Sequence, residues 1–231
     1  MHTKIFIIKN SIEDEKANQT FEAMKEIVSE DMLNILAYSG KMSDAFNLCR
    51  EICLDEKANL MVVRAGFIPN TACFDFERHV EQLNQDMVIS PTLMDRVNQS
   101  VELTAEIQSG FPIIKYASGY HQSDAIRPVN CFDHNMISVP YRALLDVGQF
   151  DTALKEFFIL TDYTLRCRWA GFEVGLDHGL GFFAPEKMNL FTENCIFISE
   201  EKKRDELTFK LDQQTFHRKY TSLIKTILEN I

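Results

Sequence analysis

One stretch of the sequence decides the fold: residues Asn135–Val174, NMISVPYRALLDVGQFDTALKEFFILTDYTLRCRWAGFEV. Near its middle, Gly148 lies in the short segment Val147–Asp151, which predicts a turn. About a dozen residues later an amphipathic pattern predicts a helix, and this helix runs into the segment Arg166–Phe172, RCRWAGF. The region therefore combines a glycine turn with a helix that carries two arginines near its end.

The composition is that of a globular protein. The chain has 231 residues, of which 45% are hydrophobic and 25% are charged, and this balance predicts one large domain, or a domain with a small appendage, with a full core. The formal net charge is −10 at pH 7. Because binding to nucleic-acid phosphates needs a basic surface, this charge argues against a nucleic-acid partner.

The cysteines and the N-terminus indicate the compartment. Six cysteines lack C-x-x-C spacing, which is typical of reduced and mostly buried thiols, including Cys49 and Cys53 on one helix face. No run of 18 or more apolar residues is present, so no transmembrane segment is expected. The chain starts directly with the apolar run Ile5–Ile8 and shows no small-residue cleavage site, so we expect a first strand there and a cytoplasmic protein.

The first 110 residues alternate short apolar runs with segments of helical period, which predicts an α/β domain with a mostly parallel sheet. Strands are expected at residues 5–8, 33–38, 60–63 and 87–89, and helices after residue 11, at 43–54 and at 76–83. Pro91 is expected to stop the fourth strand, and Pro69 with Asn70 to open a connection. On the second helix, Leu48 is expected to face the core.

The later segments are less regular. Glycine and proline punctuate residues 95–130, which predicts a hairpin or a loop. Residues 175–181, GLDHGLG, lack a strand-GxGxxG-helix context and predict a kinked strand or loop. The tail at 199–231 is charged and then amphipathic, with Leu211 among its apolar positions, and predicts one or two helices. We therefore expect one domain at 1–198 and a helical extension at 199–231.

The expected strand order also predicts a binding cleft. In open α/β sheets, ligands bind at the carboxyl ends of the strands, where strand order reverses. Asn10, Tyr38–Gly40 and Arg64–Gly66 follow the first three expected strands. These three segments are therefore expected to surround one cleft.

The order of these motifs resembles the family 2 glycosyltransferases, which carry the A-type (GT-A) fold, a Rossmann-like nucleotide-diphospho-sugar transferase fold. Family members begin with a strand that leads to an Asn, as Ile5–Asn10 does, and then carry Ala and Asn two apart on a helix, as Ala45 and Asn47 are. A Gly-x-Phe-Asp turn follows, as at Gly148–Asp151, and then a helix that ends in Arg-x-Arg-x-Ala-Gly, as at Arg166–Gly171. The resemblance implies a mixed, mostly parallel sheet flanked by helices, with a nucleotide-sugar site.

The departures from the family pattern fall on its chemistry. Where the family has an Asp-x-Asp motif that holds a divalent metal against the donor diphosphate, this sequence has Arg64-Ala65-Gly66, and neither Arg64 nor Gly66 can ligate a metal. Tyr38 and Ser39 replace the family's nucleoside-binding Asp. The resemblance therefore implies either a guanidinium that binds the diphosphate without a metal cofactor, or a fold that has lost turnover.

The Glu-Asp motif of the family can be aligned in two ways. Without a gap, Asp162 takes the place of the family's last Asp, and the Glu-Asp pair falls on Ile159-Leu160. With a gap, Asp162 becomes the Asp of the pair and the catalytic base. A further interpretation makes Asp162 half of an internal ion pair with Arg166 or Arg168, with a structural role only. Since these arginines lie two apart on a helix, one of them is expected to face water.

The resemblance thus implies three groups of candidate site residues. Asp162 is the candidate catalytic residue, His134 and Arg168 are the candidate acceptor-side residues, and no residue is assigned to a metal. The residues expected to bind the nucleotide-sugar are Asn10, Tyr38, Ser39, Asn47, Arg64 and Gly66.

The implied function is that of a divergent glycosyltransferase-like protein of glycan or glycoconjugate assembly, which lacks metal-dependent catalysis and is inactive alone, as a pseudo-enzyme or partner subunit. Two alternatives stay open. One is an active, metal-independent glycosyltransferase with Arg64 on the donor diphosphate and Asp162 as base, and the other is a glycan-binding module. Expected partners are a nucleotide-sugar, a glycan acceptor, and a partner glycosyltransferase or a second copy of the chain bound through the C-terminal helices.

Overall fold

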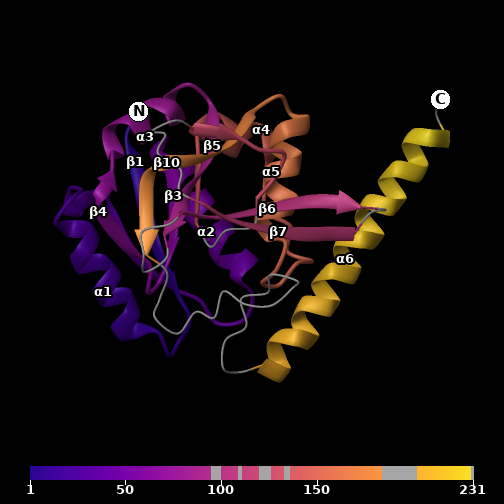
Figure 1. The fold of residues 1–231 in the computed structure, drawn as a ribbon, viewed down its shortest axis with the longest axis horizontal. Helices are drawn as coiled ribbons and strands as arrows, with labels where there is room; N and C mark the ends of the chain where they lie inside the picture. The colour runs from indigo at the N-terminus through magenta and orange to yellow at the C-terminus, as the bar shows by residue number, and fades with distance from the viewer. Residues whose placement is uncertain (95–99, 109–110, 120–125, 133–135, 184–201, 230–231) are drawn as a thin grey trace.

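The structure is a computed structural model, which describes residues 1–94, 100–108, 111–119, 126–132, 136–183 and 202–229 (Figure 1). Its strands are β1 (Thr3–Lys9), β2 (Leu33–Ala37), β3 (Asn59–Arg64), β4 (Ile68–Phe74), β5 (Met87–Met94), β6 (Ser100–Gln108), β7 (Phe111–Gly119), β8 (Ile126–Pro128), β9 (Met136–Val139) and β10 (Glu173–Phe183). Its helices are α1 (Asp14–Lys25), the short 3-10 helix η1 (Glu30–Met32), α2 (Met42–Glu56), α3 (Phe76–Asn84), α4 (Tyr141–Val147), α5 (Ile159–Trp169) and α6 (Lys202–Glu229).

The described strands form one mixed sheet, whose main path has the order β2-β1-β3-β9-β5-β10-β4. Off this path, β6 pairs with β5 and β7, and β8 pairs with β10. Parallel pairs join β2, β1 and β3, and also β5 with β10. β9 enters between β3 and β5 and runs antiparallel to both. This inserted strand makes parallel pairing less extensive than the sequence pattern predicted, although the α/β class with a mixed sheet and flanking helices is confirmed.

Helices cover both faces of the sheet, and β3 shows why. Leu60 and Val62 pack into the core beneath α2, α4, α5 and α6, whereas Met61 and Val63 pack into a second core with α1 and β4. All four side chains are fully buried. β3 is therefore apolar on both faces, as expected for a strand that helices cover on both sides.

Three local predictions are wrong. Pro69 and Asn70 belong to β4 instead of a connection, and Pro69 is tolerated because β4 is the last strand of the sheet path. β5 continues past Pro91, which lies opposite an irregularity in β10 between Asp177 and Gly181, where a missing N–H is accommodated. Leu48 is 46% exposed on the outer face of α2.

Other predictions for the later segments are confirmed. Residues 100–119 form the antiparallel hairpin of β6 and β7, and residues 175–181 belong to the kinked strand β10. The described part of the tail, residues 202–229, forms one long helix, α6. Figure 1 shows the β6–β7 hairpin reaching from the body of the sheet toward it. The expected domain boundary at residues 198 and 199 lies outside the described residues. Among the described helices, none combines the length and the apolar character needed to cross a membrane.

Candidate functional site

The carboxyl ends of β1, β2 and β3 meet at one edge of the sheet. The backbone N–H of Tyr38, just after β2, donates to the Lys9 carbonyl at 2.9 Å, and the N–H of Ala65, just after β3, donates to the Ile8 carbonyl at 2.9 Å. Asn10 follows β1 directly. The structure therefore brings together the three segments that the sequence placed around one cleft.

Arg64 at the end of β3 forms an ion pair with Glu156. Its Nη2 lies 3.4 Å from Glu156 Oε1, and the two side chains are 21% and 32% exposed. Burial raises the pKa of the neighbouring Tyr38, and the positive charge of Arg64 opposes that rise. The partly buried guanidinium thus lies beside Tyr38, which the resemblance assigned to the nucleotide-sugar site, and beside Glu156, a carboxylate that sequence reasoning did not assign to it.

The turn after β3 carries no carboxylate. Gly66 has φ = 92°, a left-handed conformation that favours glycine, and its backbone N–H donates to Thr20 Oγ1 at 2.9 Å. With a guanidinium at Arg64 and no side chain at Gly66, the residues at this turn do not fit a divalent cation. Within the described part of the chain, no three His, Cys, Asp or Glu side chains gather in a metal-binding group.

The side chains of Asn10 and Asn47 hydrogen-bond within the protein. Asn10 Oδ1 accepts the N–H of Ile12 at 3.0 Å, which stabilises the turn before α1. The Asn47 amide donates to the Phe150 carbonyl at 3.0 Å and accepts the Phe150 N–H at 2.8 Å. This pair of bonds joins α2 to the Gly148–Asp151 turn, while the expected nucleotide contact of Asn47 stays a prediction.

Asp162 on α5 is fully buried among three donors. Its carboxylate accepts Arg166 Nε at 2.9 Å, Lys219 Nζ at 2.5 Å and the Tyr220 hydroxyl at 2.8 Å. The Arg166 contact is the internal ion pair that was one of the three interpretations of Asp162, and Arg168 faces solvent as expected. Because a general base must reach the proton it removes, these contacts favour a structural role for Asp162.

Lys219 of α6 also contacts a second carboxylate. Its Nζ lies 2.7 Å from Asp151 Oδ2, so that one ammonium bridges Asp151 and Asp162. Burial alone would raise the pKa of Asp151, but the hydrogen bond from Lys219 and the charge of Arg166 leave this pKa below its ordinary value. Burial and the negative charge of Asp162 both raise the pKa of Tyr220, which therefore stays protonated as a donor.

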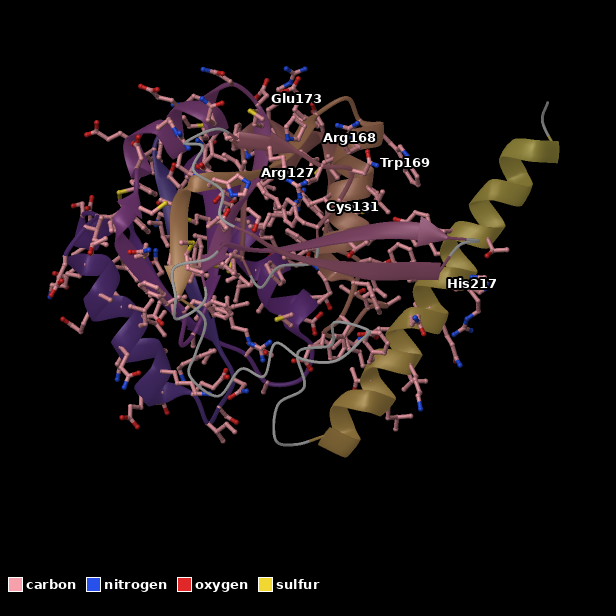
Figure 2. All side chains as sticks on the ribbon, viewed as in Figure 1. Arg127, Cys131, Arg168, Trp169, Glu173 and His217 are labelled. Carbon is pink, nitrogen blue, oxygen red and sulfur yellow. The ribbon has the colours of Figure 1, made fainter. Side chains whose placement is uncertain are left out.

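Of the two acceptor-side candidates, the structure describes Arg168 alone, and Arg168 lies away from Arg64. His134 lies outside the described residues. Arg168 is exposed near the C-terminal end of α5, where Figure 2 shows it beside Trp169 on the outer side of the helix. From Ile159 at the start of α5 to Arg168 the helix rises by about 14 Å. Arg168 is therefore well separated from Glu156, which precedes α5 and contacts Arg64.

Sequence reasoning missed Asp212 on α6. Its carboxylate is 1% exposed and accepts the backbone N–H groups of Lys155, Glu156 and Phe157 at 3.1, 2.9 and 3.0 Å. The expected inward residue Leu211 is instead 41% exposed. The available signal was an acidic residue at the three- and four-residue spacing of the apolar positions on this helix, which indicates a buried acid with a specific partner.

A buried polar cluster was also missed. His79 Nδ1 lies 2.7 Å from Asp177 Oδ2, and His79 Nε2 lies 2.8 Å from Ser138 Oγ. Arg78 Nη2 and the Gly179 N–H both donate to Asp177 Oδ1, at 2.5 and 2.9 Å. Although the order Ser-His-Asp matches that of hydrolytic triads, all three of its side chains are fully buried, so a substrate cannot reach the serine.

Comparisons with known proteins support the fold. No model of a known protein family matches the chain, and no curated protein matches it. The solved structure of A197 from STIV has a TM-score of 0.54 at 12% identity, over 88% of this chain and 92% of that chain. The structure of GalNAc-T7 with UDP, GalNAc and Mn2+ has a TM-score of 0.51 at 7% identity and covers 79% of this chain.

The described chain spans 38% of the GalNAc-T7 chain. At these identities the likeness concerns the fold alone. This protein therefore has a GT-A-like, glycosyltransferase-like fold.

Proposed function

We propose that this protein is a divergent glycosyltransferase-like protein of glycan or glycoconjugate assembly that binds the diphosphate of a nucleotide-sugar without a divalent metal. One observation carries the proposal. A GT-A-like fold has a partly buried arginine, Arg64, at the carboxyl end of β3, among the segments that follow β1 and β2. A guanidinium offers fixed positive charge and a planar set of donors, which suit a phosphate group.

In this proposal the donor site is formed by Arg64 with Tyr38, Ser39 and Asn10. Tyr38 is half-buried at the carboxyl end of β2 and feels the charge of Arg64, and the next residue, Ser39, is exposed. The contribution of Gly66 is to permit the turn that ends β3, because its N–H is already bonded to Thr20. The negative charge of the donor diphosphate would therefore be balanced by Arg64 instead of a divalent metal ion.

Turnover by the isolated chain is not part of the proposal. Asp162 is fully buried, and its carboxylate is occupied by Arg166, Lys219 and Tyr220. A base in this state has no free path to an acceptor hydroxyl. We therefore propose a pseudo-enzyme or a partner subunit, which acts with a partner glycosyltransferase or a second copy of itself.

The alternative function is an active, metal-independent glycosyltransferase in which Arg64 binds the diphosphate and Asp162 acts as base. The same Arg64 favours it, since this residue supplies the charge that transfer needs at the leaving group. The three donors on Asp162 count against it. Nucleotide release from a nucleotide-sugar separates the two functions.

The test is isothermal titration of UDP and GDP in EDTA and in Mn²⁺. We expect both nucleotides to bind in EDTA with an affinity that Mn²⁺ changes little. Arg64→Ala is expected to lower this affinity about ten- to hundredfold, because the free energy of a hydrogen bond to a charged group corresponds to about that change in affinity. Arg142→Ala is the matched control, since Arg142 also pairs with a carboxylate, Asp86, but on the exposed surface. The control is expected to bind normally.

Three other results would each lead to a different conclusion. Binding that needs Mn²⁺ and survives Arg64→Ala would overturn the proposal. Absence of nucleotide binding, with thermal stabilisation by oligosaccharides, would replace it with a glycan-binding module. Steady release of UDP from a UDP-sugar in EDTA, abolished by Arg64→Ala, would establish the active alternative.

A further inference from the structure

Glu156, the partner of Arg64, lies in the loop of residues 151–158 that precedes α5. The loop is fixed from the α2 side by two hydrogen bonds. Lys41 Nζ donates to the Thr152 carbonyl at 2.7 Å, and the Met42 N–H donates to the Lys155 carbonyl at 2.8 Å. These contacts hold the loop against the start of α2 and leave Glu156 directed at Arg64.

From the other side the loop is held by α6. Three consecutive N–H groups, of residues 155–157, point at the buried carboxylate of Asp212. A concave set of successive backbone N–H groups is an anion-binding arrangement, and here its anion is a side chain of the protein. The middle of the three N–H groups belongs to Glu156 itself.

Aromatic packing keeps Asp212 in place. Phe209 of α6 contacts Phe157 and Phe158, with ring centroids 5.3 and 5.1 Å apart, and Phe216 contacts Phe158 at 6.0 Å. Phe158 has φ = 60°, an uncommon conformation for a bulky residue, and is fully buried. One face of α6 carries Phe209, Asp212 and Phe216, so the helix packs on this loop through apolar and polar contacts together.

We propose that Asp212 of α6 is a positioning residue of the donor site, which fixes Glu156 as the resident counter-ion of Arg64 that an incoming diphosphate must displace. The Asp212 carboxylate accepts the backbone N–H of Glu156, and the Glu156 side chain pairs with the Arg64 guanidinium. These two contacts link the C-terminal helix to the positive charge of Arg64 at the end of β3. The inference depends on the proposed function, because it concerns the same site.

The chemistry of the ligand follows from this exchange. A carboxylate carries a single negative charge, whereas a diphosphate carries more charge and offers more acceptors to a guanidinium. A ligand with a diphosphate can replace Glu156 on Arg64, while a neutral nucleoside cannot. Glu156 therefore competes with every anionic ligand for Arg64, and a diphosphate displaces it more readily than a ligand with less charge.

The experiment compares Glu156→Gln, Asp212→Asn and their double variant, with UDP, UMP and uridine as probes. Glu156→Gln removes the counter-ion charge, so UDP affinity is expected to rise about three- to fivefold, which corresponds to the free energy of an ion pair near the surface. Uridine binding is expected to stay unchanged. Asp212→Asn is expected to raise UDP affinity as well. In the Glu156→Gln background it is expected to add nothing, because it acts through Glu156.

A nucleotide-free measurement accompanies the titrations. The NMR signal of the Arg64 Nε–H group, identified by its loss in Arg64→Lys, is expected to shift in Glu156→Gln and in the same direction in Asp212→Asn. Asp151→Asn is the matched control, because Asp151 lies in the same loop and contacts α6 through Lys219 but does not bind residues 155–157. The control is expected to leave the signal and the UDP affinity unchanged.

The possible failures are distinguishable. If UDP binds to no variant, the proposed function is wrong, and a common shift of the Arg64 signal in both variants still supports the positioning role. If UDP binds in an Arg64-dependent manner but Asp212→Asn leaves both the affinity and the Arg64 signal unchanged, the positioning role is wrong and the proposed function stands. Equal changes in the affinities for UDP and for uridine would also overturn the positioning role. Such changes would indicate a general loss of structure, which does not depend on ligand charge.

Discussion

At the scale of single residues, several buried polar side chains of this protein hydrogen-bond to its backbone. Asn47 shows this most clearly, because its amide satisfies both the N–H and the carbonyl of Phe150. The family resemblance indicated a nucleotide contact for Asn47. Its geometry explains an asparagine on α2 by the turn that it holds, and the nucleotide contact stays a prediction.

The first prediction concerns Asn47→Ala. Two buried backbone groups of Phe150 would lose their partners, so we expect the free energy of unfolding to fall by about 1–3 kcal/mol per unsatisfied group, as measured by urea denaturation. Asn34→Ala is the control, since Asn34 makes one partly exposed local bond at 3.3 Å to the Met32 carbonyl. An equal loss in both variants, or a loss of UDP binding in a fully folded Asn47→Ala, would contradict the structural role.

Asp177 gives the second prediction. Burial alone would raise its pKa, but the hydrogen bond from His79, followed by the Gly179 N–H and the charge of Arg78, leaves the pKa below its ordinary value. With a depressed folded pKa, the ionised carboxylate stabilises the fold above the unfolded pKa of about 4. This stability is lost as the pH falls from about 4 through the lower folded pKa.

Asp177→Asn is therefore expected to lower the free energy of unfolding by about 3–5 kcal/mol at neutral pH, because it leaves the charge of Arg78 uncompensated. It is also expected to flatten the decline in stability below about pH 4, measured by denaturant titration across pH. Asp146→Asn is the control, since Asp146 is 51% exposed in its ion pair with Arg142. A steep acid decline that persists in Asp177→Asn would contradict the assignment.

At the scale of elements, periodicity predicted the positions of several strands and helices, although it wrongly turned Leu48 and Leu211 inward. It did not predict long-range polar contacts. The apolar runs of β1 and β3 and the helical periods of α2 and α3 place these elements closely where the structure has them. The predictions from Pro91 and Pro69 were wrong because both prolines lie within strands. The sheet accommodates Pro91 beside an irregularity in β10 and Pro69 on its last strand, and both conditions exist only in the assembled sheet.

The contacts that define the site have no local sequence signal. Glu156 meets Arg64 across 92 residues, and Asp212 meets the loop before α5 across 55 to 57 residues. Such contacts depend on where the loop and α6 lie after folding. The sequence could therefore indicate the position of Arg64 at the end of β3 but could not indicate its counter-ion or the residue that positions it.

The third prediction concerns α6. Lys219 bridges Asp151 and Asp162, so Lys219→Met removes one hydrogen-bonded ion pair from each carboxylate, and we expect a loss of about 1.5–3 kcal/mol in the free energy of unfolding. Lys210→Met on the exposed side of the same helix is the control and is expected to change stability by less than about 0.5 kcal/mol. Equal stability of the two variants in chemical denaturation would show that α6 does not depend on this bridge.

At the scale of the whole molecule, one GT-A-like sheet carries the proposed donor site at the end of β3, and a C-terminal helix packs on the loop beside it. The fold is supported by the likeness to A197 and GalNAc-T7. The guanidinium of Arg64 takes the position at which the resemblance predicted a pair of metal-binding carboxylates. The proposed metal-free binding of a diphosphate follows from that single replacement.

The fourth prediction tests this replacement directly, by anomalous diffraction from crystals soaked with UDP and Mn²⁺. We predict UDP density with its diphosphate on Arg64 and no manganese peak at the turn that ends β3. A manganese ion bound beside Gly66, bridging the protein and the diphosphate, would contradict the account.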